Sequence, residues 1–214
     1  MKGLKVLSNI PDFDYFSKIL GYEEYKAAIE NTNGDKESLK DVFWNVLADD
    51  YWWEFINGEI ILRGGMTLKA CGANQNLMFT LLNFVNENDL GEVFGGRSIC
   101  DFGENFFSPN IIYFDNEKSK IFKGNTNRFP VPDFILECND DVCEEQNRGI
   151  KFEEYAKYGV GEYWMLNPNK ETIEQYALRK GSFDFVGIFK ENEIIESGIL
   201  RGFKISPTDI FNNS

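Results

Sequence analysis

The stretch from Arg128 to Pro168, RFPVPDFILECNDDVCEEQNRGIKFEEYAKYGVGEYWMLNP, decides the fold of this chain. Its apolar run 134–136 is closed by Glu137 and predicts a buried strand. The following residues, 139–147, hold two aspartates and two glutamates. They are too polar for a core, so we expect an acidic turn at the end of the strand.

The second half of the stretch predicts a helix and another strand. Apolar residues recur at helical spacing from Ile150 to Tyr158, and Gly159 is a suitable stop. Residues 163–166 then read as a strand, with a turn after them. A strand that carries a carboxylate, followed by a helix that carries Lys151, is in outline the arrangement of a metal-dependent nuclease.

Working outward, the chain alternates strands and helices. Asn57-Gly58 between two apolar runs predicts a hairpin over 52–62. A helix is expected over Asn74–Asn86, and one strand over 106–114. Further strands follow residue 168. We therefore expect an α/β (α+β) fold with a central mixed sheet flanked by helices.

Residues 1–40 look only loosely tied to this core. Apolar residues at helical spacing between Phe13 and Ile29 predict helices, and Ser38 is a reasonable N-cap for the next one. We expect an N-terminal helical extension, 1–40, and a main domain, 41–214. The extension either covers the core or forms a homodimer arm, and the residues leave both open.

Charge argues against nucleic acid as a bulk partner. The chain has 22 Lys and Arg against 35 Asp and Glu, a net charge of −13 at pH 7. Nonspecific DNA or RNA binding depends on basic surface that releases counterions. A local basic cleft or bound divalent ions can offset an acidic average, so DNA stays open as a partner.

The residue types present limit the chemistry. The chain contains no histidine and four scattered cysteines. This excludes Ser-His and Cys-His catalysis and disfavours zinc. Without an export signal, reduced thiols are expected. Any reaction must therefore use carboxylates, lysine and a metal ion.

No feature directs the chain to a membrane. No apolar run approaches the ~20 residues that span a bilayer. Residues 1–5 lack the apolar segment of a signal peptide. We expect a cytoplasmic protein with no membrane partner.

Three strings of the deciding stretch carry a family resemblance: Pro132-Asp133-x-x-x-Glu137, Lys151-x-x-x-Tyr155 and Gly159-Val160-x-Glu162-Tyr163-Trp164. They resemble the Uma-two family of restriction endonucleases, which is placed in the PD-(D/E)XK nuclease superfamily. The resemblance covers roughly residues 51–181. It implies a restriction-endonuclease-like core and a Mg²⁺-dependent (or Mn²⁺-dependent) endonuclease that hydrolyses DNA phosphodiester bonds.

The resemblance also implies site residues. Glu137 corresponds to the metal-binding carboxylate, and the backbone carbonyl of Cys138 is expected to ligate beside it. The alternative for Glu137 is a strand-terminal glutamate in solvent. Lys151 corresponds to a catalytic lysine that the family carries on the following helix. Its spacing from Tyr155 favours an inward side chain over a surface lysine, and both remain open.

Two positions depart from the superfamily pattern. Where a metal-binding aspartate is expected on the preceding strand, this chain has Asn110, which can coordinate Mg²⁺ but carries no charge. Where a lysine is expected two residues after Glu137, it has Asn139. The protein is then a weakened nuclease or one with compensating ligands, for which Asp140, Asp141 and Glu104 are candidates.

For four other residues a structural role is favoured over a functional one. Asp133 lies on the same strand face as Glu137 but at the opposite end of the strand. This position favours a role in forming the turn after Pro132 over a role as a metal ligand. Glu54 corresponds to a family glutamate that could be an accessory ligand, although a solvent-facing hairpin carboxylate is favoured. Tyr163 and Trp164 are expected in the core, with base stacking as the alternative.

Two functional hypotheses follow. The first is a Mg²⁺-dependent endonuclease acting on DNA, with Glu137 and Asn110 at the metal and Lys151 at the phosphate. The second is a catalytically inactive module that keeps the nuclease fold and binds a protein or nucleic-acid partner. Metal binding through Glu137 distinguishes them.

Overall fold

The structure is a computed structural model, and it describes residues 4–7, 22–47, 52–139 and 143–211. Contacts divide the chain into two compact units. The smaller comprises residues 1–65 and 101–108, and the larger comprises 66–100 and 109–214. The domain boundary between residues 40 and 41 stays a prediction.

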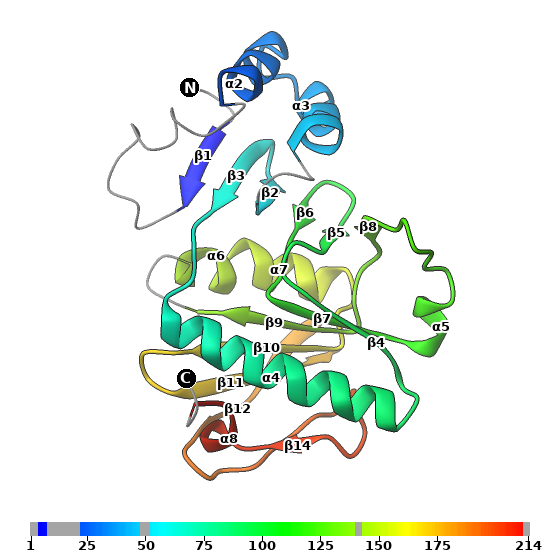
Figure 1. The fold of residues 1–214 in the computed structure, drawn as a ribbon, viewed down its shortest axis with the longest axis vertical. Coiled ribbons are helices and arrows are strands. Elements are labelled where there is room, and N and C mark those ends of the chain that lie inside the picture. Colours follow the sequence, from blue (N-terminus) through cyan, green and yellow to red (C-terminus); the bar gives the residue numbers. More distant parts are fainter. Residues whose placement is uncertain (1–3, 8–21, 48–51, 140–142, 212–214) are drawn as a thin grey trace. The chain divides into compact units, whose positions relative to one another are not determined.

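The smaller unit combines a sheet with helices (Figure 1). Its elements are β1 (Leu4–Leu7), α2 (Tyr22–Asn31), α3 (Lys36–Val42), the π-helical turn η1 (Phe43–Leu47), β2 (Trp53–Ile56), β3 (Glu59–Arg63) and β6 (Phe106–Phe107). The strands are ordered β1-β3-β2-β6. β1 is parallel to β3, whereas β2 is antiparallel to β3 and β6.

The predicted hairpin is present in this unit. Asn57 and Gly58 both have positive φ, 52° and 82°, as a tight two-residue hairpin turn requires. The rings of Phe43, Phe55 and Phe106 pack together, with centroids 5.5 to 6.1 Å apart. These contacts join η1 to the hairpin and to β6, which lies far away in sequence.

The N-terminal expectations hold only in part. The expected helical residues up to Ile29 fall partly in α2, while residues 8–21 lie outside the described ones. The strand β1 was not expected. Ser38 is not the cap of α3. Asp35 is the N-cap, because its carboxylate accepts the Ser38 N–H at 2.9 Å.

The larger unit is built on a six-stranded mixed sheet. In spatial order its strands are β12 (Ser182–Lys190), β11 (Thr172–Arg179), β10 (Glu162–Asn167), β9 (Phe134–Cys138), β7 (Ile111–Asp115) and β4 (Gly91–Gly95). Only β9 and β10 run parallel; the other pairs are antiparallel. Parallel neighbours need a crossover, which the helices between them supply.

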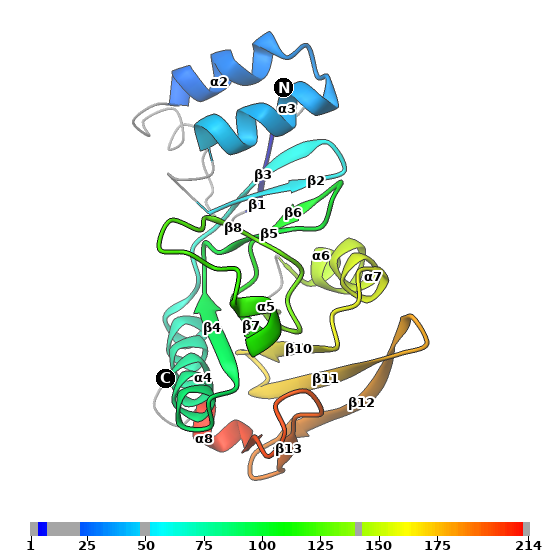
Figure 2. The ribbon, with the colours of Figure 1, turned by 90° about the vertical axis from the view of Figure 1, so that its right-hand side faces the viewer.

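Helices cover both faces of this sheet (Figure 2). They are α4 (Leu68–Glu87), α5 (Asn116–Ser119), α6 (Glu144–Arg148), α7 (Ile150–Lys157) and α8 (Pro207–Phe211). The apolar stripe of α4 packs on one face with Leu136 and Trp164. On the other face, Tyr155 of α7 contacts Tyr163 edge to face at 5.3 Å. This places α7 over the central parallel pair.

Short strands complete the unit. β5 (Ile99–Asp101) pairs in parallel with β8 (Arg128–Phe129). β13 (Ile195–Glu196) pairs with β14 (Lys204–Ile205). None of the helices in the described residues combines the length and apolar character that crossing a bilayer requires. The four cysteines, all within the described residues, form no disulfide.

Three element boundaries differ from the sequence predictions. The helix expected from Asn74 begins at Leu68, because Thr67 caps it by accepting the Ala70 N–H. The strand expected over 106–114 is split into β6 and β7 around Pro109, which has no N–H for a ladder. The expected acidic turn contains the helix α6.

Candidate active site

Glu137 lies near the end of β9 with its side chain toward α7. Successive strand side chains point to opposite faces. Phe134, Leu136 and Cys138 belong to the core beneath α4, so Glu137 faces the other side. It is 0% exposed. The alternative of a solvent-facing glutamate is therefore excluded.

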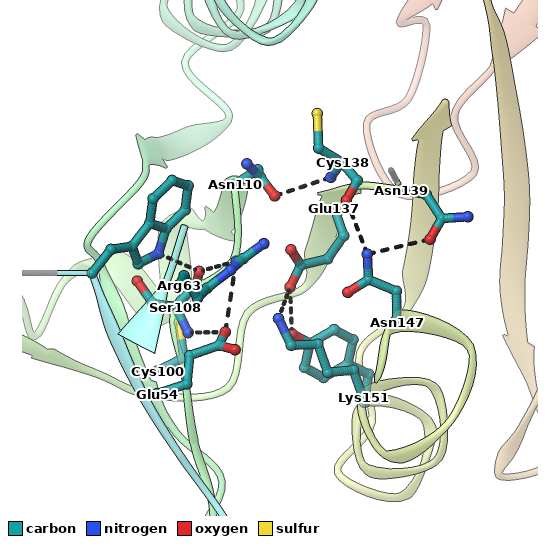
Figure 3. A network of polar contacts seen from close by, with 12 residues as sticks. Glu54, Arg63, Cys100, Ser108, Asn110, Glu137, Cys138, Asn139, Asn147 and Lys151 are labelled. Carbon is teal, nitrogen blue, oxygen red and sulfur yellow. Dashed lines mark hydrogen bonds and ion pairs between the residues drawn. The ribbon is translucent and has the colours of Figure 1, made fainter. Parts of the chain in front are cut away.

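Two donors from α7 converge on this carboxylate, and Figure 3 shows the contact of Lys151. The Lys151 ammonium Nζ lies 2.7 Å from Glu137 Oε1, and the Tyr155 hydroxyl donates to the same oxygen at 2.9 Å. Residues four apart share one helix face. Lys151 is 1% exposed, so the alternative of a surface lysine is excluded.

This buried charge pair is costly to form. Taking a carboxylate and an ammonium out of water costs several kcal/mol per ion, and their attraction repays this only with good hydrogen-bond geometry. Glu137 and Lys151 meet that condition at 2.7 Å, with Tyr155 as an added donor. Apolar residues of similar size would stabilise the core as well, so stability alone does not account for the pair.

Asn110 and Cys138 join Glu137 at this end of the sheet. β7 pairs with β9 so that Ile111 is opposite Leu136, and the same register continued by one residue places Asn110 beside Glu137. Asn110 is buried, and its Oδ1 accepts the Cys138 N–H at 2.9 Å. Three predicted ligand positions therefore lie together, and the oxygen of Asn110 serves a backbone amide.

Two further asparagines border the same corner. Asn139 occupies the position where the superfamily has lysine, and its N–H donates to Leu166 O at 2.7 Å. Asn147 of α6 is fully buried. Its Nδ2 donates to Cys138 O at 3.0 Å and lies 3.4 Å from Asn139 Oδ1. Amide side chains thus surround the end of β9.

Asp133 lies apart from this corner and holds the beginning of β9. Its carboxylate pairs with Lys118 at 2.8 Å and accepts the Asp115 N–H at 2.9 Å. Its backbone carbonyl accepts the Gly161 N–H at 2.9 Å. The side chain therefore links the chain entering β9 to β7, and the backbone carbonyl links it to the chain entering β10, as in a structural residue.

The three candidate compensating carboxylates receive no support as ligands. Asp140 and Asp141 lie outside them. Glu104 belongs to the smaller unit, where it pairs with Lys36 and Lys40. The hydrogen bond from Lys36 is the main cause that lowers the pKa of Glu104.

The expectation of a solvent-facing Glu54 is wrong. Glu54 is 0% exposed, and it accepts the Ser108 N–H at 2.9 Å. Arg63, itself buried, lies 3.6 Å from this carboxylate and donates to Ser108 O at 2.8 Å (Figure 3). The guanidinium and the backbone amide offset the burial of the charge. Glu59, across the hairpin turn, is exposed.

Arg148, which the sequence leaves without a role, ties α6 to the sheet. It forms a two-pronged ion pair with Glu174 of β11 and a further pair with Glu144. The Arg148 hydrogen bond lowers the pKa of Glu174. Burial raises the pKa of the neighbouring Tyr176 hydroxyl to about 12. This network fixes the helix that carries Asn147.

Tyr163 and Trp164 lie in the core, on opposite faces of β10. Both side chains are fully buried. Tyr163 packs against Tyr155 of α7, and Trp164 packs against Phe134 at 5.3 Å. Neither ring is accessible to a nucleobase, so base stacking by these residues is excluded.

Two residues of the corner received no role from sequence reasoning. Tyr155 lies in the Lys151-x-x-x-Tyr155 string, and its spacing from the lysine was the available signal. Asn147 lies in a segment expected to be a solvated turn, and no sequence signal marked it. Within the described residues, no group of three or more His, Cys, Asp or Glu side chains could hold a metal.

The fold and this corner define a nuclease-like α+β protein. A family model described as "Uma2: Putative restriction endonuclease" matches residues 43–208. The chain belongs to this family, as the resemblance of its motifs predicted. No curated protein matches the chain.

A solved structure agrees with this fold. It is described as "a putative nuclease belonging to DUF820 from Anabaena variabilis ATCC 29413". The TM-score is 0.69 at 18% sequence identity, covering 80% of this chain and 96% of the other. At that identity the likeness concerns the fold, and it confirms the predicted arrangement of mixed sheet and flanking helices.

Proposed function

We propose that this chain is a divalent-ion-dependent endonuclease that hydrolyses DNA phosphodiester bonds slowly. The observation that supports this most is the buried contact of Glu137 with Lys151 and Tyr155. A carboxylate and a lysine in direct contact are two of the groups that phosphodiester hydrolysis needs. The replacement of the expected aspartate by Asn110 predicts the low rate.

The chain's own residues have distinct tasks in this proposal. Lys151 has three N–H donors, so it can hold Glu137 and still donate to a phosphate oxygen that gains charge. Tyr155 fixes the rotation of the Glu137 carboxylate. Asn110 holds the Cys138 amide and so sets the position of the Cys138 carbonyl. The corner is rigid before any substrate arrives.

The donor set fits a hard divalent cation. Mg²⁺ and Mn²⁺ prefer oxygen ligands, and the corner offers oxygens of Glu137, Asn110 and the Cys138 carbonyl. The buried side-chain oxygen of Asn147 has no hydrogen-bond partner among the described residues, as expected beside a site for a positive group. A bound divalent ion polarises the phosphate and lowers the pKa of the attacking water.

The small number of charged ligands predicts weak cation binding at this corner. Among the described ligand candidates only Glu137 is charged, and Lys151 already offsets it. Cation affinity increases with the number of charged ligands. We therefore expect weak Mg²⁺ or Mn²⁺ binding, and cleavage only at high ion concentration.

The test is nicking of supercoiled plasmid with Mn²⁺ and with Mg²⁺. Wild type should nick slowly, and Glu137→Gln, which keeps the size of the side chain, should not. Glu59→Gln is the matched control, because it removes an exposed glutamate charge from the other unit. It should nick like wild type. Equal nicking by folded Glu137→Gln and wild type would remove Glu137 from the reaction.

A second candidate function is a noncatalytic nuclease-fold module that binds a protein or nucleic-acid partner. Asn110 favours it, because its oxygen is engaged by the Cys138 N–H and adds no charge. The net charge of −13 also opposes DNA binding. If neither wild type nor Asn110→Asp nicks plasmid although both are folded, this second function is the better one.

A further inference from the structure

We propose that Asn147 supplies an additional ligand to the cation site around Glu137, through its side-chain oxygen Oδ1. This inference rests on the proposed function and names a residue that no motif of the sequence marks. It would make α6 part of the site, together with β9.

The first observation is an unsatisfied buried oxygen. Asn147 is 0% exposed, and its Oδ1 has no hydrogen-bond partner among the described residues. A buried acceptor left in this state destabilises the folded protein. Such a group in a folded protein calls for an explanation, of which a bound ion or water is one.

The orientation of this amide follows from its neighbours. Nδ2 faces Cys138 O at 3.0 Å and Asn139 Oδ1 at 3.4 Å, and both of these atoms are acceptors. Turning the amide over would set oxygen against oxygen. The chemistry of the corner therefore assigns Oδ1 to the unsatisfied position.

The oxygen lies at the proposed site and is held there. Asn147 binds the carbonyl of Cys138, the residue after Glu137, and Figure 3 shows its oxygen on the side of the Glu137 carboxylate. The Tyr163 hydroxyl donates to the backbone oxygen of Asn147 at 3.3 Å. The next residue, Arg148, is anchored to Glu174. Ligands fixed in this way are typical of metal sites.

A cation explains the arrangement better than another donor from the chain. The described hydrogen bonds of Lys151 and Tyr155 go to Glu137 Oε1, and neither side chain satisfies Asn147 Oδ1. A neutral amide oxygen is an accepted ligand for a hard divalent ion.

The experiment measures Mn²⁺ binding by the paramagnetic resonance signal of free Mn²⁺, with melting temperature as a second readout. Asn147→Asp adds a charge at the proposed ligand, so Mn²⁺ affinity should rise about tenfold. Without the ion this variant should melt below wild type, because a carboxylate then faces the Cys138 carbonyl. Mn²⁺ should restore its melting temperature.

Two further variants make the result specific. Asn147→Ala removes the ligand and should weaken Mn²⁺ binding at least tenfold. Asn83→Asp adds the same charge on the exposed face of α4 and should leave the affinity unchanged. An affinity that stays at the wild-type value in both Asn147 variants would overturn the inference, as would equal gains in Asn147→Asp and Asn83→Asp.

Glu137→Gln separates this inference from the proposed function. If it abolishes Mn²⁺ binding while both Asn147 variants bind like wild type, Asn147 is no ligand and the proposed function stands. If it binds like wild type, the proposed function fails. Where wild-type binding is too weak to detect, a gain in Asn147→Asp that Glu137→Gln removes supports the ligand role, and no gain overturns it.

Discussion

Two glutamates on neighbouring strands are equally buried and have opposite surroundings. Glu137 near the end of β9 meets a lysine and a tyrosine from one helix. Glu162 at the beginning of β10 meets only neutral donors among the residues that the structure describes. They are the Trp164 indole, the Gln175 amide, the Ser197 hydroxyl and the N–H groups of Gly198 and Ile199.

Under the proposed function, this difference separates a structural carboxylate, Glu162, from one that takes part in the reaction, Glu137. The donors of Glu162 reach both of its oxygens and come from β10, β11 and the 197–199 segment. They join three parts of the unit, and no cation is among them. Glu137 instead pairs with a buried ammonium, the group to which the proposed function gives a contact with phosphate. The two glutamates are equally buried, so the type of donor is what distinguishes them.

Breaking the ion pair of Glu137 and Lys151 should have the largest effect on stability and on nicking. Lys151→Met leaves the Glu137 carboxylate buried without its cation. We expect the free energy of unfolding to fall by about 3–5 kcal/mol at neutral pH, and plasmid nicking to vanish. Urea denaturation measures the first and the nicking assay the second.

The double variant Glu137→Gln/Lys151→Met tests the cause. It removes both charges and should regain most of the lost stability, because an uncharged pair needs no compensation. If Lys151→Met alone were as stable as wild type, the contact would not be an ion pair, and the contrast with Glu162 would disappear.

A change at Glu162, whose donors are neutral, should reduce stability less than loss of Lys151 and should not affect nicking. Glu162→Gln turns an NH₂ group toward donors that need an acceptor, such as the N–H groups of Gly198 and Ile199. We expect a loss of about 1–3 kcal/mol in unfolding free energy. Nicking per folded molecule should not change. A specific loss of nicking at a temperature where the variant is folded would make Glu162 more than structural.

Asn110→Asp should strengthen divalent-ion binding at the corner around Glu137. An aspartate keeps an oxygen for the Cys138 N–H and adds a charge beside Glu137. We expect about tenfold tighter Mn²⁺ binding by calorimetry, or about 1.4 kcal/mol, and faster nicking. Unchanged affinity would mean that the ion is bound away from Asn110.

The smallest effect on stability is expected for the partly exposed ion pair of Glu174 and Arg148. The Arg148 hydrogen bond lowers the folded-state pKa of Glu174 below its ordinary 4.5. The resulting stability is present above pH 4.5 and is lost as the pH falls through the lowered pKa. Glu174→Gln should therefore lose up to about 1 kcal/mol at pH 7 and nothing at strongly acidic pH.

Urea denaturation at neutral and acidic pH measures this difference. Glu144→Gln is a useful comparison, because the Arg148 hydrogen bond also lowers the pKa of Glu144, but its pair is more exposed. Its effect should be smaller still. A loss in Glu174→Gln that persists unchanged at acidic pH would show that the ion pair is not its source.

Sequence reasoning placed Glu137 and Lys151 at one corner through the family resemblance, and helix spacing favoured an inward Lys151. Strand period and helix spacing alone left a solvent-facing glutamate and a surface lysine open, and the buried contact of the two side chains excludes both alternatives. Sequence reasoning failed for Glu54, because a position in a hairpin does not reveal that the carboxylate pairs with Arg63 and accepts the Ser108 N–H. Asn147 was missed for the same reason, since its side chain, in a segment expected to be a solvated turn, contacts the end of β9.

The sequence by itself determined the mixed fold, the hairpin at Asn57-Gly58 and the family, because these depend on hydrophobic period, turn residues and motif order. Tertiary structure decided which buried groups meet. The 2.7 Å contact of Glu137 with Lys151, and the orientation of Asn147 toward Cys138, require pairing of β7, β9 and β10 and packing of α6 and α7. Such contacts join residues distant in sequence, and their geometry exists only after the core has formed.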